Sequence, residues 1–407
     1  MSTVLTYFNE LEKPVSKVFA AMEARGVRVD LDYLRSLKET LEAQQRPIKE
    51  AILNELGPIN LNSPKQLLGA LNAKQIQPSL KGKPSTDKRA LAAYATNPIV
   101  SNLLRFSELD TLLSSFVYPY LGRNVEVVHP FFNQCGTRTG RPSCSNPNLL
   151  QIPRRTDNGK LVRRMFIPRY GMVMGDCDFG QIEPRVLAHL SKDPILCGMF
   201  NEGIDFHTFT AERLGIDRDK AKVLNLSVGY LATGYSVGQQ LGCSYEEAEK
   251  VIEEWWKLFP ALRRWEDKLI YDSTKSGYCT TLLGRRIKID GLDSPVSFFN
   301  RVTGKKVYYI RDAARKQLIN NIAQGSAAEI MKMAMIKIDK ELCHGAYQAT
   351  TKFGLLVQVY DELLFEADSR DIKQVAKDVT ECMENAMKLD VPLVVDCKIG
   401  QNWTECH

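Results

Sequence analysis

The sequence has no apolar run that approaches the ~18 to 20 residues needed to span a bilayer. Its amino terminus, MSTVLTYFNELEKP, lacks the basic stretch and apolar core of a secretory signal, and it lacks the arginine and serine richness of an organelle transit peptide. These absences argue against a membrane protein and against an exported one. We therefore expect a protein that stays in the cytoplasm.

Cysteine pairs with the spacing of metal or redox motifs are also absent. None of the ten cysteines forms a Cys-x-x-Cys pair, and none lies in a cysteine–histidine cluster with zinc-binding spacing. The sequence therefore indicates neither a disulfide framework nor a structural metal site. We expect most of these cysteines to be reduced residues of the core.

A strong net charge is missing too, because 54 Lys+Arg against 48 Asp+Glu leave only +6 over 407 residues. Such a balance does not by itself predict a nucleic-acid partner. Between Gln151 and Tyr170, however, a basic stripe accompanies a single acid, Asp157. Its six cations are Arg154, Arg155, Lys160, Arg163, Arg164 and Arg169. The stripe could neutralise phosphates, or it could be an ordinary solvated face.

The 407 residues suffice for two or three domains, and the 44% of hydrophobic residues suffice for several cores. Apolar residues recur at three-to-four spacing from Val15 to about Leu121, which predicts a mostly helical region. Two β-like runs follow, VEVVHPFF and GMVMGDCDFG. The second predicts a buried strand that ends near Asp178.

Helices are predicted again from about Pro184 to Ala261, with one long helix over EEAEKVIEEWWKLFPALRRWEDKL. We expect Trp255, Trp256 and Trp265 in that region to be packing residues and not platforms for stacked bases. A further helix is predicted over GSAAEIMKMAMIKIDKEL. The later run FGLLVQVYDELLFEA predicts a hairpin with acids at its tip.

Two carboxylates are predicted at the ends of strands. Asp178 closes the buried strand, and Asp361 lies at the tip of the hairpin. Carboxylate oxygens suit Mg²⁺, and paired ions about 4 Å apart suit in-line displacement at phosphorus. Asp176, two residues before Asp178, is a weaker candidate ligand. The alternative is that each acid only caps a turn.

A third element, RDKAKVLNLSVGYLATGY, places Arg218, Lys222, Leu226 and Tyr230 at four-residue spacing on a predicted helix. Two cations followed by an apolar residue and a tyrosine could meet a ligand with a polyanionic end and a flat ring, such as a nucleoside triphosphate. Without the two acids, an ordinary amphipathic helix would be the better explanation.

These segments resemble motifs of the family A DNA polymerases, the polymerase I family. DFGQIEPR at 178–185 resembles motif A, the segment from Arg218 to Tyr230 resembles motif B, and VYDE at 359–362 resembles motif C, in the order of the family. Other matching segments extend the resemblance over nearly the whole chain. They include TRTGRPSCSNPNLLQIPRR at 137–155, GIDFHTFTAERLG at 203–215, TLLGRRIKI at 281–289 and NNIAQGSAAEIMKMAM at 320–335.

The resemblance implies an α+β, right-hand polymerase fold. A helical thumb would span residues 30–125, a β-sheet palm 126–185 and 321–407, and helical fingers 186–320, while residues 1–29 would pack on the palm. Because so few residues precede the thumb-like region, we expect a polymerase domain only, without a 3′→5′ exonuclease or a 5′ nuclease. A viral or plasmid-borne member of the family is compatible with that expectation.

The resemblance also implies roles for single residues. The carboxylates of Asp178 and Asp361, with the carbonyl of Phe179, would hold two Mg²⁺ ions, for which Mn²⁺ could substitute. Glu362 would lie beside these ligands, and Lys222 would be a candidate proton donor to the leaving pyrophosphate. The residues implied to bind the nucleotide are Arg218, Lys222, Leu226, Tyr230, Gln181, His207 and Glu183. Those implied to bind DNA are Arg141, Asn320, Gln324, Lys316 and Tyr360.

Within this set Glu183 would act as a steric gate that leaves no space for a ribose 2′-hydroxyl. Five positions depart from the family pattern. Tyr360 replaces a histidine, Gly180 a serine, Pro184 a leucine, Leu226 a phenylalanine and Lys316 an arginine. None of these replacements removes an implied metal ligand, but Tyr360 changes how the primer-terminal backbone would be held.

The implied activity is template-directed addition of deoxynucleotides to a primer 3′ end. The implied partners are primer-template DNA and deoxynucleoside triphosphates, with a helicase, a primase or a separate exonuclease as further partners of a monomer in a bacterial or virus-infected host cell. Two alternatives stay open. A single-subunit RNA polymerase is disfavoured by Glu183, and a catalytically dead DNA-binding subunit is disfavoured by the joint presence of Asp178, Asp361, Lys222 and Arg218.

Overall fold

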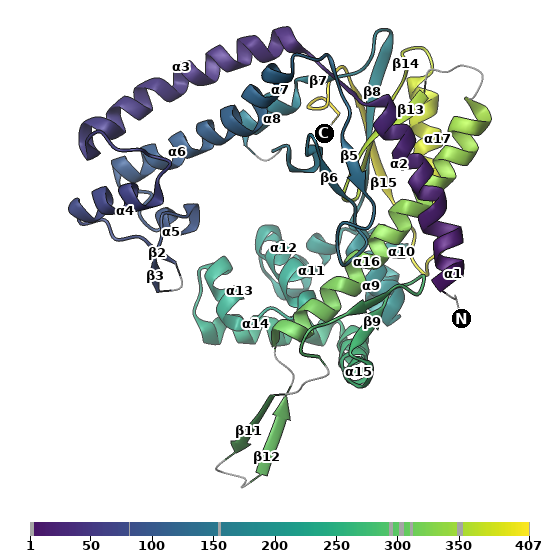
Figure 1. Cartoon of the computed structure of the whole chain (residues 1–407). Coiled ribbons are helices and arrows are strands. Elements are labelled where there is room, and N and C mark those ends of the chain that lie inside the picture. Colours follow the sequence, from purple (N-terminus) through teal and green to yellow (C-terminus); the bar gives the residue numbers. More distant parts are fainter. Residues whose placement is uncertain are drawn as a thin grey trace. The chain divides into compact units, whose positions relative to one another are not determined.

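The computed structural model describes residues 4–80, 82–153, 156–292, 296–300, 305–309, 312–347 and 353–406 (Figure 1). The chain divides into two compact units. Unit 1 comprises Met1–Arg25, His129–Leu150 and Gly171–Ile399, and unit 2 comprises Gly26–Val128, Gln151–Tyr170 and Gly400–His407.

A four-stranded sheet forms the centre of unit 1. Its strands lie in the order β13 (Phe353–Val359), β14 (Glu362–Asp368), β8 (Met172–Phe179) and β15 (Val395–Gly400). Both β13–β14 and β14–β8 are antiparallel pairs. Every residue of β13 and β14 is buried. The sequence therefore predicted the hairpin and the buried strand correctly, because long apolar runs of strand length indicate strands that are covered on both faces.

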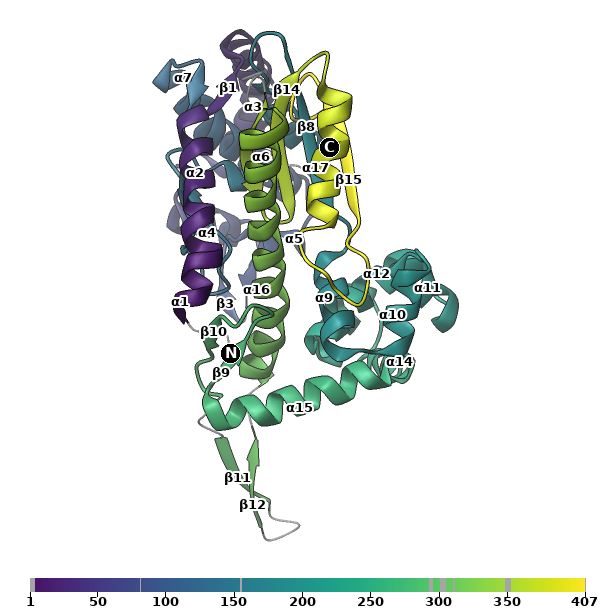
Figure 2. The same cartoon turned by 90° about the vertical axis from the view of Figure 1, so that its right-hand side faces the viewer.

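Two helices pack against this sheet, and a third packs against both of them (Figure 2). The helix α2 (Lys13–Arg25) contacts β13, α17 (Ile372–Glu384) contacts β8 and β14, and α16 (Asp312–Ile338) contacts α2 and α17. The segment before α2 contains α1 (Val4–Tyr7) and the π-helical turn Phe8–Glu12, and a second π-helical turn, Asp339–Ala346, follows α16. The helix expected over residues 325–342 is thus present and begins earlier than expected.

A buried ion pair joins α16 to the amino-terminal segment. The ammonium group of Lys332, 2% exposed, donates to both carboxylate oxygens of Glu12 at 2.7 and 2.9 Å and to the carbonyl of Gln134 at 3.2 Å. Burial lowers the pKa of Lys332, although the charge of Glu12 opposes that shift. Removing either partner would leave an uncompensated charge in the core.

Seven helices lie between residues 179 and 278 in unit 1. They are α9 (Ile182–Ser191), α10 (Pro194–Asn201), α11 (Phe206–Leu214), α12 (Arg218–Ser227), α13 (Gly234–Leu241), α14 (Tyr245–Leu258) and α15 (Pro260–Ser276). The remaining strands of the unit form three two-stranded pairs. These pair β5 (Phe131–Asn133) with β6 (Ser143–Ser145), β9 (Tyr278–Thr280) with β10 (Arg286–Lys288) and β11 (Val296–Asn300) with β12 (Lys305–Tyr309).

The tryptophans of this region pack as expected. Trp255 and Trp256 are 1% and 8% exposed in a core that also contains Phe259, and Trp265 packs partly buried against the same core. The single long helix predicted here was wrong, because α14 ends at Leu258 and α15 begins at Pro260. Proline lacks the N–H that a continuous helix needs, whereas at the first position of a new helix that N–H has no partner to lose.

Unit 2 is mostly helical, as expected for the region up to Leu121. Its helices are α3 (Leu31–Leu56), α4 (Pro64–Ala73), α5 (Lys88–Ala92), α6 (Pro98–Leu112), α7 (Tyr118–Arg123) and α8 (Asp157–Arg163), and α6 runs into α7 through a π-helical turn, Leu113–Val117. Short strands form the sheet β4 (Val127–Val128), β1 (Val27–Val29) and β7 (Phe166–Ile167) and the pair β2 (Ser79–Leu80) and β3 (Lys83–Pro84). Of these, β4 lies within the predicted β-like run VEVVHPFF, and the others were not predicted from the sequence.

The basic stripe is not a uniform charged face. Arg163 is only 2% exposed, and its guanidinium lies 4.4 Å from the ring centroid of Trp403. Lys160 donates to Asp157 at 3.0 Å on the surface. Arg154 and Arg155 lie outside the described residues. Arg163 is therefore a packing residue, and counting cations along the sequence overstated the surface charge of the stripe.

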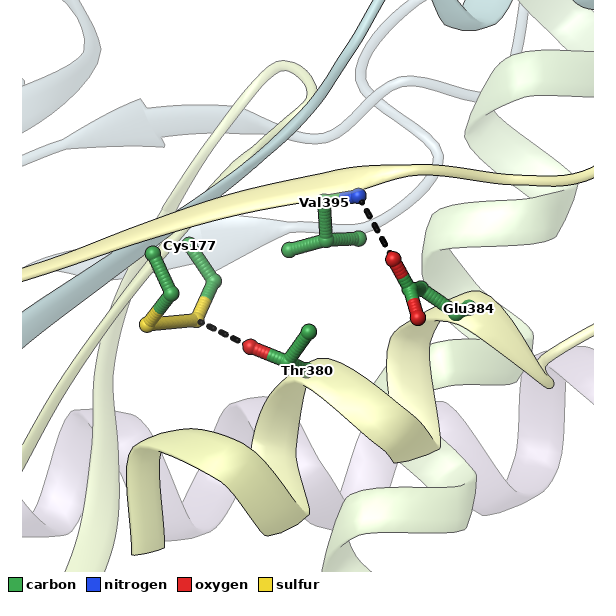
Figure 3. Close-up of a disulfide and its surroundings, with 5 residues drawn as sticks. Cys177, Thr380, Glu384 and Val395 are labelled. Atoms are coloured by element: carbon green, nitrogen blue, oxygen red, sulfur yellow. Dashed lines mark hydrogen bonds between the residues drawn. A yellow bond between two sulfur atoms is a disulfide. The ribbon is translucent and has the colours of Figure 1, made fainter. Parts of the chain in front are cut away.

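The expectation about cysteines needs one correction. Cys177 on β8 and Cys397 on β15 form a disulfide between adjacent strands, and the Cys177 sulfur lies 3.9 Å from the Thr380 hydroxyl on α17 (Figure 3). A separation of 220 residues gives no signal in a spacing motif. Among the other cysteines, Cys144, Cys279, Cys382 and Cys406 are buried, as expected.

Among the helices in the described part of the chain, none combines the length and the apolar character that a bilayer crossing requires.

One buried carboxylate caps two helices of unit 1. Asp193 is fully buried, and its Oδ1 accepts from the N–H groups of Ile195 and Leu196 at the start of α10, at 3.0 and 3.2 Å. Its Oδ2 accepts from the N–H groups of Ala261 and Leu262 at the start of α15, at 2.9 and 3.1 Å. The same side chain thus fixes the helix start that the sequence reading missed.

We expect Asp193→Ala to lower the free energy of unfolding by about 2 to 4 kcal/mol, because two helix caps are lost and their donors stay buried. Urea unfolding of the whole chain measures this change. Ser244→Ala, which removes the exposed cap of α14, is the matched control and should cost about 1 kcal/mol. Equal losses in the two variants would contradict the double-cap interpretation.

Candidate active site

The carboxylates predicted at strand ends lie at one end of the central sheet. In the β8–β14 pair Asp178 is directly opposite Glu362, and Val359 of β13 is the partner of Glu362 on the other side. Tyr360 and Asp361 therefore form the hairpin turn itself. The N–H of Phe179 donates to the carbonyl of Asp361 at 3.1 Å, which ties the end of β8 to that turn.

These groups supply two carboxylates, a third beside them and a backbone carbonyl, all oxygen donors of the kind that Mg²⁺ prefers. Among the described residues no group of three or more His, Cys, Asp or Glu side chains is arranged as a complete metal cage. Mg²⁺ commonly takes one or two carboxylates together with substrate phosphates, so the donor set fits that ion. Asp176 is opposite Leu364, farther along β8 and 4% exposed. It does not lie at the turn.

The junction between β8 and α9 is held by main-chain contacts. The N–H of Gly180 donates to the carbonyl of Val394 at 2.8 Å, and Arg185 donates to the carbonyls of Gly180 and Pro392 at 2.8 and 2.7 Å. A Cβ at Gly180 would lie 3.5 Å from its nearest neighbour, so the serine of the family pattern would also fit. Pro184 lies in the first turn of α9, where proline is tolerated.

Glu183 connects two of the predicted site residues. Arg141 donates to its Oε1 at 2.6 Å, and the Tyr230 hydroxyl donates to its Oε2. Burial raises the pKa of Tyr230 well above its ordinary value, and the charge of Glu183 adds to the shift, so the phenol stays a donor. The Arg141 guanidinium also lies 5.5 Å from the ring centroid of Tyr360. A continuous chain of contacts thus links the hairpin turn to Tyr230.

We expected one helix to carry four site residues on one face, and α12 carries the first three of them. Arg218, Lys222 and Leu226 lie on the exposed side of α12, and Leu226 is 53% exposed. Tyr230 does not belong to this helix, because α12 ends at Ser227 and Tyr230 closes a 3₁₀ turn over Val228–Tyr230. The tighter turn carries the tyrosine hydroxyl to Glu183.

Asp205 is a site residue that the sequence reading missed. Its Oδ1 accepts from Arg218 at 3.1 Å, and its Oδ2 accepts from the Gln181 amide at 3.1 Å. It also caps α11 through the N–H of Thr208 at 2.8 Å. Burial raises the pKa of Asp205, but the hydrogen bonds from Thr208 and the charge of Arg218 outweigh burial and lower it overall. An aspartate before a helix reads only as a cap, which hid this second role.

His207 is a buried residue of α11 and is 7% exposed. Burial lowers its pKa, and the charges of Arg218 and Lys222 act in the same direction, while Asp205 opposes them. Its Nδ1 lies 3.0 Å from the side-chain nitrogen of Asn225, a buried residue of α12 that the sequence reading did not single out.

The remaining predicted residues lie on α16. Lys316, Asn320 and Gln324 follow at four-residue spacing and are all partly exposed, so they share one face. At Gly325 the helix approaches the loop that carries Arg141, since a Cβ there would lie 3.3 Å from the carbonyl of Thr139. Gln324 and Arg141 are therefore on neighbouring segments.

The assembled site has oxygen donors at the end of a sheet and cations on the exposed face of a nearby helix. Gln181, which follows β8, and Arg218 on α12 share Asp205 as a partner. Such an arrangement can hold a polyphosphate between divalent cations and basic side chains.

Comparison with known proteins gives a consistent result. The family model described as DNA polymerase family A matches residues 31–405. A thermostable DNA polymerase I of Thermus thermophilus is 37% identical over 98% of this chain and 48% of that protein. DNA polymerase I of Bacillus subtilis is 35% identical over 98% of this chain and 46% of that protein. The chain thus spans about half the length of the curated relatives it matches.

A solved structure is similar over nearly the whole chain. It is the POL domain of Pol1 from M. smegmatis in complex with DNA primer-template and dNTP, with a TM-score of 0.83 and 34% identity over 98% of this chain and 71% of that one. The right-hand polymerase fold expected from the sequence is therefore confirmed.

Proposed function

Because the chain belongs to family A of the DNA polymerases, we propose that it adds deoxynucleotides to the 3′ end of a primer paired to a DNA template. The observation that carries this proposal is the meeting of Asp178, Asp361 and Glu362 at one sheet end, within a unit that also presents Arg218 and Lys222 on an exposed helix face. The solved relative, a complex with DNA primer-template and dNTP, supports the same substrates.

The carboxylates of Asp178 and Asp361 and the carbonyl of Phe179 would hold two Mg²⁺ ions, or Mn²⁺ in their place. Bound there, the ions would lower the pKa of the primer 3′-hydroxyl and neutralise charge on the phosphates. Glu362, buried and opposite Asp178, adds two carboxylate oxygens at this point of the sheet, and oxygen donors are the ligands that divalent cations prefer.

The incoming triphosphate would lie along the exposed face of α12. Arg218 and Lys222 would contact its phosphates, and Lys222, which is exposed and has no ion pair in the described part of the chain, would donate a proton to the departing pyrophosphate. Arg218 is held by Asp205, which orients its guanidinium and reduces the entropy lost on binding. Gln181 lies beside the same carboxylate.

The sugar would lie against Glu183, Tyr230 and Leu226. Glu183 is fixed from both sides by Arg141 and Tyr230. A side chain held in this way cannot move aside for a 2′-hydroxyl without breaking two charged hydrogen bonds. We therefore assign to Glu183 the selection of deoxyribose over ribose.

Duplex DNA would be contacted by Arg141, Tyr360, Lys316, Asn320 and Gln324. Their types suit contacts to backbone and groove edges that read duplex shape more than sequence. We also propose that residues 30–125 form a thumb, that residues 126–185 and 321–407 form a palm, and that residues 186–320 form fingers. The separate compact unit that contains Gly26–Val128 supports the first of these.

Primer extension with purified protein, Mg²⁺ and either deoxy- or ribonucleotides tests this proposal against its alternatives. Extension with deoxynucleotides only is expected. Extension with ribonucleotides would favour an RNA polymerase, and binding of the duplex without extension by either set would favour a DNA-binding subunit.

We expect Asp178→Ala and Asp361→Ala each to abolish extension while primer-template affinity changes less than about threefold, because each removes a metal ligand and leaves the basic surface intact. Single-turnover extension and fluorescence anisotropy measure the two properties. Asp157→Ala removes a fully exposed acid of unit 2 and serves as the control. If Asp178→Ala or Asp361→Ala extended the primer at close to the wild-type rate, the assignment of that residue as a metal ligand would be wrong.

For the sugar gate, Glu183→Ala should raise the ratio of ribo- to deoxynucleotide incorporation by about 10- to 100-fold, because it opens space for one hydroxyl. Glu183→Gln retains the volume and should stay close to wild type. The ratio of kcat/KM for the two sugars is measured with one base. Equal ratios in the wild type and both variants would show that Glu183 does not face the sugar.

A further inference from the structure

The Asn225 side chain has a partner at each of its hydrogen-bonding positions. Asn225 is 4% exposed, and its Oδ1 accepts from the indole N–H of Trp255 at 2.7 Å. The Thr210 hydroxyl lies 3.0 Å from the same oxygen and 2.9 Å from the Phe206 carbonyl, and its single proton can go to either. Its Nδ2 donates to the carbonyl of Phe206 at 3.0 Å and lies 3.0 Å from Nδ1 of His207. Two acceptor and two donor positions are all that a carboxamide has.

The orientation of this carboxamide follows from its partners. An indole N–H can only donate and a backbone carbonyl can only accept, so Oδ1 must face Trp255 and the NH₂ group must face Phe206. If the carboxamide were rotated by 180°, its NH₂ group would face the indole N–H of Trp255 and its Oδ1 would face the carbonyl of Phe206. Because both ends are fixed, the second N–H of Asn225 points at Nδ1 of His207, and that nitrogen must accept.

This contact fixes the protonation of His207. A neutral ring has one N–H, and with Nδ1 accepting, the proton must be on Nε2. A proton on Nδ1 would face the amide N–H at 3.0 Å. Of the charged groups near the ring, Arg218 and Lys222 on α12 also disfavour the imidazolium, and Asp205 at the start of α11 favours it, while burial disfavours it most.

We propose that Asn225 is a positioning residue that holds His207 as the neutral Nε2–H tautomer, so that the ring offers one N–H donor to the phosphates of the incoming triphosphate. The phosphate contact rests on the proposed function, whereas the tautomer does not. A neutral donor adds a directed hydrogen bond without a third cation beside Arg218 and Lys222. The charge of the phosphate site therefore stays constant over the pH range in which histidine usually titrates.

The first experiment observes the ring in the free protein. Selective ¹⁵N labelling gives five histidines, and loss of one signal set in His207→Gln assigns His207. We expect the two ring nitrogens to report an Nε2–H tautomer that persists as the pH falls through histidine's ordinary range of about 6 to 7. An Nδ1–H tautomer, or a ring that protonates in that range, would overturn the proposal even in an active polymerase.

The second experiment changes the partner of Nδ1. Asn225→Asp has the same shape but accepts where Asn225 donates, so the neutral ring should then carry its proton on Nδ1. In this variant the ring is charged at lower pH and still has an Nε2–H, but it loses that proton as the pH rises. We expect KM for the triphosphate to rise about three- to tenfold between about pH 7 and 9 in the variant and to stay level in the wild type.

Trp255→Phe is the matched control, because it removes one hydrogen bond of the same buried network while the Phe206 carbonyl still holds the NH₂ group of Asn225 toward His207. It should resemble the wild type in both the tautomer and the pH profile of KM. If both variants behave alike, Asn225 is only a structural residue and the positioning role is wrong. If the tautomer is as expected but KM of Asn225→Asp does not change with pH, His207 does not donate to the phosphates.

The tautomer of His207 and the proposed polymerase function can be refuted independently of each other. A wild-type protein that extends no primer would refute the proposed function, and the tautomer of His207 would still be measured by its ring nitrogens. If Asn225→Asp does not fold, the ring signals of the wild-type protein decide whether Asn225 fixes the tautomer.

Discussion

The antiparallel register between β8 and β14 determines where the acidic groups of the site lie. It places Asp178 opposite Glu362, and the adjoining turn brings the carbonyl of Asp361 to the N–H of Phe179. A shift of one residue would send each side chain to the other face of the sheet. Since β14 is buried on both faces along its whole length, such a shift would also exchange the buried surroundings of its acidic and its apolar residues. Core packing and the position of the site therefore have the same cause.

The cation-bearing helix is fixed by buried polar contacts more than by its exposed residues. Asn225 joins α12 to α11 and α14 through four hydrogen-bonding partners, so any movement of α12 must carry those two helices with it or leave buried polar groups without partners. Toward the sheet, the Tyr230 hydroxyl donates to Glu183, so a movement that separated the two would leave this partly buried donor without its acceptor.

Sequence patterns predicted the elements whose signal is local. The hairpin, the strand ending at Asp178 and the exposed cations of α12 all follow from periodicity and residue type. What the patterns could not predict depends on distant partners. Nothing in the sequence places Asp205 beside Arg218 and Gln181, and it was not singled out. Arg163 was counted in the basic stripe, but its guanidinium packs on the ring of Trp403. The end of α14 before Pro260 did have a local signal, which is the proline itself. We predicted one long helix because the apolar pattern continues across that proline.

The departure at Tyr360 shows how a replaced motif residue can be built into the site. Its φ of 59° is left-handed, a conformation that costs a tyrosine about 1 kcal/mol or more relative to glycine. This conformational cost is present although the ring is 48% exposed and buries little apolar surface in return. The ring instead faces Arg141, which donates to Glu183. A functional contact explains strain at such an exposed residue better than packing does. Here the contacts connect the turn that we propose to bind metal with the residue that we propose to select the sugar.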